Sequence, residues 1–150
     1  MAKFDLHTPE TAPEGARDFI TGVNKKMGFV PSLYAVLAEN PTVLNAYTQL
    51  SDQLATSGLS PLEQQVVTIT ASVENECHFC VAAHTTVSES TGLDMDVIYA
   101  VREDRAIADS KLEALRQFTK KTVIDRGFVS DAAVDAFLAA GYTRSDVLAV

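Results

Sequence analysis

Turn-forming residues divide this chain into stretches with helical periodicity, and they restrict its fold more strongly than any other feature. Five of the seven glycines directly follow such stretches, where a residue with positive φ commonly ends a helix. They are Gly28, Gly58, Gly92, Gly127 and Gly141. Other stretches have a proline near their start, and proline is well suited to the first turn of a helix. These prolines are Pro31, Pro41 and Pro61. The pattern therefore predicts an all-α fold.

We expect about eight helices, packed as a single-domain helical bundle. Their predicted ranges are 13–27, 31–39, 41–57, 61–74, 76–91, 95–103, 107–126 and 131–140, and a ninth helix begins near 144. A length of 150 residues fits one domain over 1–150, because a chain of this size buries about 68–70% of its extended surface on folding. Residues 1–12 are predicted to form an N-terminal arm that either wraps around the bundle or is disordered.

Residues 61–74 carry sequence signals for both a strand and a helix. The run V-V-T-I-T at 66–70 is β-branched throughout and, read alone, favours a strand. Ser60 and Glu63, however, have the spacing of a capping box, in which each side chain accepts a backbone N–H of the other residue. The uninterrupted stretch is also longer than an ordinary strand. We therefore predict a helix, apolar nearly all round, at the centre of the bundle or at a contact between subunits.

The composition excludes several classes of partner. Lys and Arg number 12 against 20 Asp and Glu, so the net charge is −8 and the pI is near 4.7. A negative chain is poorly suited to nucleic acid or to an anionic membrane surface. No apolar run reaches the roughly 18 residues of a membrane span, and the N-terminal segment lacks the apolar region of a secretory signal. We expect a cytoplasmic protein with no nucleic-acid or membrane partner.

The two cysteines, Cys77 and Cys80, are separated by only two residues. A disulfide that closes so small a loop adds little to fold stability, because the entropic benefit shrinks with loop length. In a chain with no export signal, a pair at this spacing is typical of redox-active or metal-binding cysteines.

The segment around the cysteines places three reactive side chains on one helix face. If Asn75 is the N-cap, the helix dipole and the unpaired N–H groups of the first turn favour a thiolate at Cys77 or Cys80. His84 lies four residues after Cys80, where an imidazole can take a thiol proton. Cys77 lies three residues before Cys80, close enough for a disulfide. The spacing supplies a nucleophilic thiol, a base and a second thiol.

Two other interpretations of these residues stay open. Cys77, Cys80 and His84 are three possible zinc ligands, although a closed zinc site needs a fourth and there is no second cysteine pair. Alternatively, the cysteines are small buried apolar residues and the histidine is a hydrogen-bonded core residue. Outside the segment, we assign no role to His7, which we expect to be solvated, or to R-E-D-R at 102–105, which we interpret as a solvated face.

The segment C-H-F-C-V-A-A-H at 77–84 resembles the alkylhydroperoxidase D-like branch of the carboxymuconolactone decarboxylase superfamily. It is preceded by L-S-P-L-E-Q-Q-V-V-T-I-T-A-S-V-E-N and followed by D-M-D-V-I, and the resemblance is strongest over 58–105. The resemblance implies an all-helical homo-trimer or homo-hexamer. It also implies a thiol peroxidase or disulfide reductase that destroys hydroperoxides, uses its own redox-active disulfide and no other cofactor, and is recharged by an external dithiol.

The resemblance also implies roles for individual residues. Cys80 matches the cysteine that attacks the peroxide and becomes a sulfenic acid, and Cys77 matches the partner that closes the disulfide. His84 matches the histidine of the proton relay, and His78 lies within the pair. In many C-x-x-C proteins the first cysteine is the more acidic, but the spacing to His84 favours Cys80 as the attacking thiolate here.

The sequence departs from the family pattern at the relay glutamate. This residue usually lies twelve positions before the first cysteine, where the present chain has Gln65. A glutamine can hydrogen-bond a histidine but cannot accept its proton. Glu74 and Glu63 are the candidate replacements, and Glu74 is the better placed in sequence. We therefore predict catalytic residues Cys80, Cys77, His84 and Glu74.

Two alternative functions remain from other classes. The first is a noncatalytic module, either redox-sensing or a zinc-stabilised oligomer. The second is an enzyme of the same superfamily that acts on a lactone or carboxylate without using the thiols. Because the decarboxylase branch generally lacks the cysteine pair, decarboxylation is the weaker inference.

Overall fold

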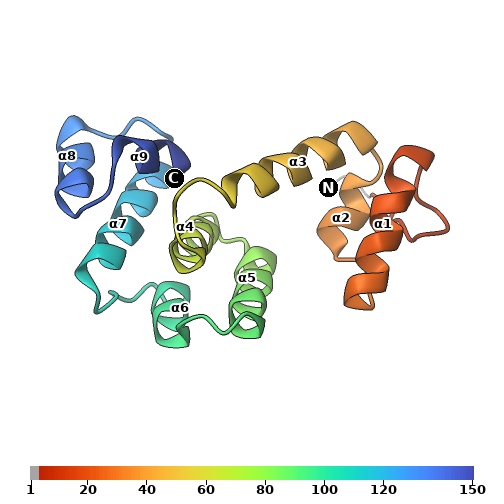
Figure 1. Cartoon of the computed structure of the whole chain (residues 1–150), viewed down its shortest axis with the longest axis horizontal. Coiled ribbons are helices and arrows are strands. Elements are labelled where there is room, and N and C mark those ends of the chain that lie inside the picture. The colour runs from red at the N-terminus through yellow and green to blue at the C-terminus, as the bar shows by residue number, and fades with distance from the viewer. Residues whose placement is uncertain (1–3) are drawn as a thin grey trace. The chain divides into compact units, whose positions relative to one another are not determined.

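The computed structural model describes residues 4–150, and within this range it contains nine α-helices and no strand (Figure 1). Their bounds are α1 Glu14–Met27, α2 Ser32–Leu37, α3 Pro41–Leu54, α4 Pro61–Glu74, α5 His78–Ser90, α6 Met95–Arg102, α7 Ser110–Ile124, α8 Asp131–Ala139 and α9 Arg144–Ala149. The predicted all-α fold is confirmed, and the ninth helix starts at the expected residue.

The helices group into two compact units. The first ends at Leu54 and contains α1, α2 and α3, and the second runs from Ala55 to Val150 and contains α4 to α9. Each unit has its own cluster of buried apolar side chains. The single domain expected over 1–150 stays a prediction.

The first unit includes most of the predicted N-terminal arm, of which residues 1–3 lie outside the described range. His7 corrects the sequence-based expectation of a solvated side chain, because only 12% of its side-chain surface is exposed. Its Nε2 lies 2.7 Å from a carboxylate oxygen of Glu39, and its backbone N–H donates to the carbonyl of Ala35. The described part of the arm therefore packs against α2 and the residues that follow it.

Helix α4 is the central element of the second unit. It contacts α5, α6 and α7, and Val66 and Ile69 on it are completely buried (Figure 1). The predicted central position of this helix is confirmed. Its β-branched residues are accommodated because apolar neighbours cover most of its circumference, so tertiary packing outweighs the local preference for a strand.

The predicted capping box starts α4 at the expected residue. The hydroxyl of Ser60 accepts from the backbone N–H of Glu63 at 3.3 Å, and the Glu63 carboxylate accepts from the backbone N–H of Ser60 at 2.8 Å. Both interactions satisfy N–H groups that the first turn leaves without helical partners. The start of α4 is therefore fixed by local chemistry, and its C-terminal end then positions the cysteines.

Candidate functional site

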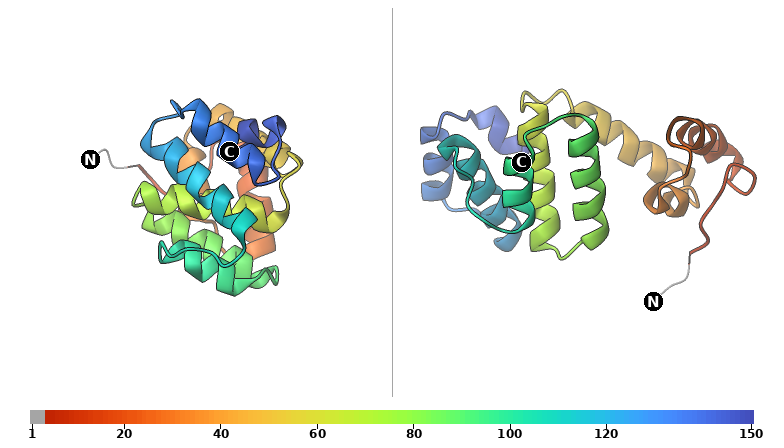
Figure 2. Two further views of the ribbon diagram at one scale, coloured as in Figure 1. Left: turned by 90° about the vertical axis from the view of Figure 1, so that its left-hand side faces the viewer. Right: turned by 90° about the horizontal axis from the view of Figure 1, so that it is seen from below.

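A tight turn after α4 brings the chain back alongside it as α5 (Figure 2, right). The N–H of Cys77 donates to the carbonyl of Ser72 at 2.9 Å, and the N–H of Glu76 donates to the carbonyl of Val73 at 3.0 Å. This pair of hydrogen bonds is a Schellman motif, and it requires a left-handed residue, which here is Glu76 with φ 54°. The turn therefore fixes where Cys77 lies relative to α4.

The Schellman motif also corrects the predicted start of the next helix. We expected Asn75 to be its N-cap, but Asn75 is the C-cap of α4, and its side-chain amide donates to the carbonyl of Ala71. Helix α5 begins at His78 with Cys77 as its N-cap. The prediction failed because a glutamate occupies the left-handed position, where glycine is the usual signal.

The two cysteines form a disulfide at the start of α5. Their Cα atoms are 5.3 Å apart, within the usual range for a disulfide. The Sγ atom of Cys77 also accepts the backbone N–H of Cys80 at 3.4 Å. The predicted proximity of the two sulfurs is confirmed. In the reduced protein, the same N–H and the helix dipole favour a thiolate at Cys77.

His84 lies one turn after Cys80 on α5 and is half-buried. Its Nδ1 is 2.9 Å from Oε1 of Gln65 on α4, and since an amide oxygen only accepts, Nδ1 carries the proton. Burial lowers the pKa of His84, because a low-dielectric environment disfavours the imidazolium. Burial therefore favours the neutral ring, in which the lone pair of Nε2 can take a proton.

The predicted relay residues lie in different surroundings. Gln65, at the position of the family's glutamate, contacts His84 directly. The carboxylate of Glu74 lies 2.8 Å from Nζ of Lys120 on α7, and that of Glu63 is used in the capping box. Within residues 4–150, the hydrogen bond of the His84 ring is to Gln65, and the relay role of Glu74 stays a prediction.

Comparison with known proteins identifies the family. The family model for carboxymuconolactone decarboxylases matches residues 41–121. The chain belongs to the carboxymuconolactone decarboxylase family. This match covers more than half of the chain and includes α4, α5 and the C-x-x-C segment, so the predicted superfamily is confirmed. None of the curated proteins compared with the chain matches it.

Two crystal structures resemble this family member closely. One, from Ralstonia eutropha JMP134, is described as an alkylhydroperoxidase core and an uncharacterised peroxidase-related protein. It is 25% identical, with a TM-score of 0.84 over 97% of this chain and 79% of that chain. The other, an uncharacterised peroxidase-related protein from Silicibacter sp. TM1040, is 21% identical. Its TM-score is 0.83 over 99% of this chain and 78% of that chain, and it shows the fold alone.

A cavity of about 350 Å³ lies beside the C-x-x-C turn of this carboxymuconolactone decarboxylase family protein. The end of α4, the first turns of α5 and the last residue of α6 line it, and it is open to solvent. Its lining residues are Ser72, Val73, Glu76, His78, Val81, Ala82 and Arg102. Arg102 is exposed, as expected for a solvated face, but the sequence gives no sign of this cavity, because nothing in it indicates that the end of α6 meets the start of α5.

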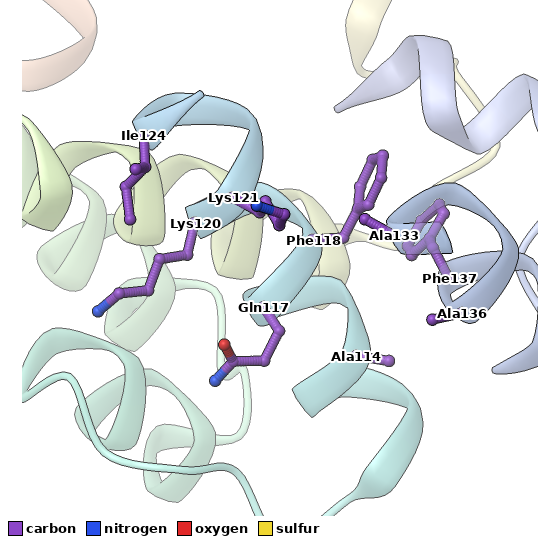
Figure 3. A pocket seen from close by; sticks show the side chains of 9 residues that line it. All are labelled: Ala114, Gln117, Phe118, Lys120, Lys121, Ile124, Ala133, Ala136 and Phe137. Atoms are coloured by element: carbon purple, nitrogen blue, oxygen red, sulfur yellow. The ribbon is translucent and has the colours of Figure 1, made fainter. Parts of the chain in front are cut away.

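A second cavity, of about 360 Å³, lies between α7 and α8 (Figure 3). Phe118 and Phe137 border it at one end and Ile124 at the other, while Lys120 extends away from the two phenylalanines. It contains none of the predicted site residues.

The arrangement of possible metal ligands among the described residues bears on the zinc interpretation. Within residues 4–150, there is no group of three or more His, Cys, Asp or Glu side chains that could hold a metal ion. Cys77 and Cys80, which the zinc interpretation needs as thiolates, are bonded to each other.

No helix in the described part of this family member has the length and apolarity needed to cross a membrane.

Proposed function

We propose that this protein is a thiol-dependent peroxidase that reduces hydroperoxides through a Cys77–Cys80 dithiol/disulfide cycle. The observation that carries the proposal is the cysteine pair at the start of α5, with His84, bonded to Gln65, one turn further along the same helix. The peroxidase-related description of the similar structure from Ralstonia eutropha JMP134 supports the same class of enzyme.

The oxidative half of the cycle begins with a proton transfer. Nε2 of His84 takes the proton of the Cys80 thiol, since Nδ1 already carries one and donates it to Gln65. The Cys80 thiolate attacks one oxygen of the hydroperoxide, an S–O bond forms and the O–O bond breaks. The alkoxide leaves and takes up a proton as the alcohol, and Cys80 is left as a sulfenic acid.

The second thiol then completes the oxidation. The thiolate of Cys77, favoured by the N–H of Cys80, attacks the sulfur of the sulfenic acid and displaces hydroxide, which leaves as water after protonation. An external dithiol supplies two electrons and restores both thiols. Gln65 serves as a positioning residue for His84. Glu74 enters this scheme only if it leaves Lys120, its present partner.

A homo-trimer or homo-hexamer in the cytoplasm is part of the same proposal. Helix α3 supports self-association, because four of its apolar side chains are between 39% and 60% exposed. They are Val43, Tyr47, Leu50 and Leu54, spaced by four, three and four residues. This is the spacing of an apolar seam between helices. Sedimentation velocity measures the oligomeric state, and a monomer at micromolar concentration would contradict this part of the proposal.

Single-cysteine variants test the peroxidase proposal. Cys80→Ser abolishes hydroperoxide consumption, whereas Cys77→Ser still reacts once and accumulates a sulfenic acid that dimedone traps on Cys80. Peroxide loss is followed with a ferrous–xylenol orange assay, and trapping is followed by mass spectrometry. If Cys77→Ser cycles normally with a dithiol, the resolving role is wrong. If Cys80→Ser consumes peroxide as fast as the wild type, the proposal is wrong.

The family match also favours a second candidate, an enzyme that acts on a lactone or carboxylate without using the thiols. The double variant Cys77→Ser/Cys80→Ser separates the two functions, because it retains full activity only if the thiols are uninvolved. A noncatalytic zinc-bound module predicts stoichiometric zinc in protein purified without chelators and no peroxide consumption.

A further inference from the structure

The cavity beside the C-x-x-C turn contains ionisable side chains that the peroxidase cycle leaves without a role. Glu76, His78 and Arg102 line it together with small and apolar residues. Among residues 4–150, none of these three side chains has a hydrogen bond or an ion pair. A carboxylate and a guanidinium therefore border one cavity without neutralising each other.

The neighbouring charged side chains behave differently. Glu74 lies 2.8 Å from Lys120, Asp104 lies 2.8 Å from the same ammonium group, and Glu103 lies 2.7 Å from Arg105. Ion pairing is thus the rule around the end of α6. Glu76 and Arg102, both unpaired, line the same cavity, and opposite charges bordering one cavity are complementary to a zwitterion.

The backbone at Glu76 gives a second indication. Its φ of 54° is a conformation that glycine adopts freely and that costs other residues about 1 kcal/mol or more. Asp104 has a similar φ of 51°, and its carboxylate makes ion pairs with Lys120 and Arg116. Glu76 is thus a strained residue that lines the cavity and whose carboxylate has no partner among residues 4–150.

We propose that this cavity binds a small zwitterionic thiol of the amino-acid type, which reduces the Cys77–Cys80 disulfide in addition to the dithiol proposed above. Its carboxylate contacts Arg102 and its ammonium group contacts Glu76. The inference rests on the proposed redox cycle, and it adds a second electron donor and a binding site for it.

The position of the cavity favours the reductant over the hydroperoxide. At about 100° per residue, the mean direction of His78, Val81 and Ala82 on α5 lies roughly 150° from Cys80 and roughly 110° from His84, although Val81 alone is about 60° from His84. A hydroperoxide activated by His84 therefore does not need this cavity. Cys77 is not itself a lining residue, but it is flanked in sequence by Glu76 and His78, both of which line the cavity, so the proposal places the bound thiol next to this cysteine.

The chemistry consists of two thiol–disulfide exchanges. The thiolate of the bound molecule attacks Sγ of Cys77, a mixed disulfide forms, the Cys77–Cys80 bond breaks and Cys80 leaves as a thiolate. A second thiol molecule attacks the external sulfur of the mixed disulfide and releases Cys77 as a thiolate, which accepts the N–H of Cys80. Two thiols are oxidised to one external disulfide, and their two protons pass to the two protein thiols.

The reductive half-reaction, measured without peroxide, tests the inference. The oxidised full-length protein is mixed with L-cysteine, N-acetyl-L-cysteine, L-cysteine methyl ester or the uncharged 2-mercaptoethanol. The second-order rate of disulfide opening is read by quenching with an alkylating reagent and mass spectrometry. Rates with each thiol are compared between wild type, Arg102→Gln and Glu76→Gln, so that differences in the pKa of the thiols cancel. Arg144→Gln, at an exposed arginine outside the cavity, is the matched control.

Each variant is expected to lose one part of the selectivity. Arg102→Gln slows L-cysteine and N-acetyl-L-cysteine by about three- to fivefold, the upper part of the range for an exposed ion pair, and leaves the methyl ester unchanged. Glu76→Gln slows L-cysteine and the methyl ester and does not slow N-acetyl-L-cysteine. No variant changes the rate with 2-mercaptoethanol, which shows that the disulfide is intact in each.

Two results would overturn the inference. The first is that each of the variants Arg102→Gln and Glu76→Gln changes the rates with all four thiols by the same factor, or changes none of these rates. The second is a slower reaction of reduced Arg102→Gln protein with a carboxylate-bearing hydroperoxide, with unchanged thiol rates, which would assign the cavity to the peroxide. The reaction of reduced wild-type protein with hydroperoxide is measured separately, and its absence would refute the proposed peroxidase but not the selectivity for thiols.

Discussion

Replacing Gln65 by glutamate tests the contact on which the proposed proton transfer depends. Nδ1 of His84 donates to the neutral Oε1 of Gln65 at 2.9 Å, and Gln65→Glu places a carboxylate oxygen at the same point. An adjacent negative charge stabilises the imidazolium, so the variant should raise the pKa of His84, which burial now lowers. His84 then becomes a stronger base for the Cys80 thiol.

The size of the effect follows from the change in the hydrogen bond. A neutral hydrogen bond contributes about 1 kcal/mol and one to a charged group about 1.5–3 kcal/mol, so the substitution adds about 1.4 kcal/mol, which is about tenfold in the proton affinity of His84. A full Coulomb interaction at an effective dielectric constant of 20 would give about 4 kcal/mol at 4 Å. We use the value of about 1.4 kcal/mol, because a half-buried carboxylate also loses part of its hydration and this loss opposes the Coulomb attraction.

The assay combines histidine titration with pre-steady-state kinetics. NMR of the His84 ring should show the higher pKa, and reduced Gln65→Glu protein should react with hydroperoxide about three- to tenfold faster at pH 7.5, because the thiolate fraction grows at most in proportion to the proton affinity of the base. Gln65→Met, which has a similar size but no acceptor, should be slower than wild type. If Gln65→Glu and Gln65→Met change the rate in the same direction, the contact with Gln65 does not tune His84.

Three further predictions concern pH and stability. Since burial lowers the pKa of His84, the peroxide reaction should slow only below pH 6.5, and His84→Gln should remove this dependence. The Arg116 guanidinium lowers the pKa of Glu113 to about 2, so Glu113→Gln should destabilise the protein at pH 7 in urea titrations. That difference should shrink as the pH falls from 4.5 towards 2, where Glu113 itself becomes protonated. Phe137→Ala should cost about 3–5 kcal/mol in urea unfolding, whereas Phe128→Ala, at a position 88% exposed, should stay within about 0.5 kcal/mol.

The parts of the fold that could be predicted from the sequence are those set by local chemistry. The capping box of Ser60 and Glu63 starts α4 where the spacing indicates, and the same motif at Thr143 and Asp146 starts α9. Helix ends without such a signal are less accurate, since the helix predicted over 41–57 ends at Leu54. The contact of His7 with Glu39 joins residues far apart in the sequence, and no local pattern indicates it.

In the candidate site, too, the features set by local sequence could be predicted and those set by contacts between helices could not. The spacing of Cys77 and Cys80 within one turn was enough to predict that their sulfurs meet. The contact between Gln65 and His84 joins two helices, and only the family resemblance pointed to position 65. The exact start of α5 and the cavity beside it depend on the left-handed backbone at Glu76 and on the placement of α6, neither of which has a signature in the sequence.

Helix α4 carries the amide of Gln65 in its second turn and the turn that ends in Cys77 at its C-terminus. Any sliding of this helix along α5 would shift the orientation of the imidazole and the location of a sulfur atom in a single movement. Loss of reactivity on warming should therefore precede the cooperative melting of the remaining helices.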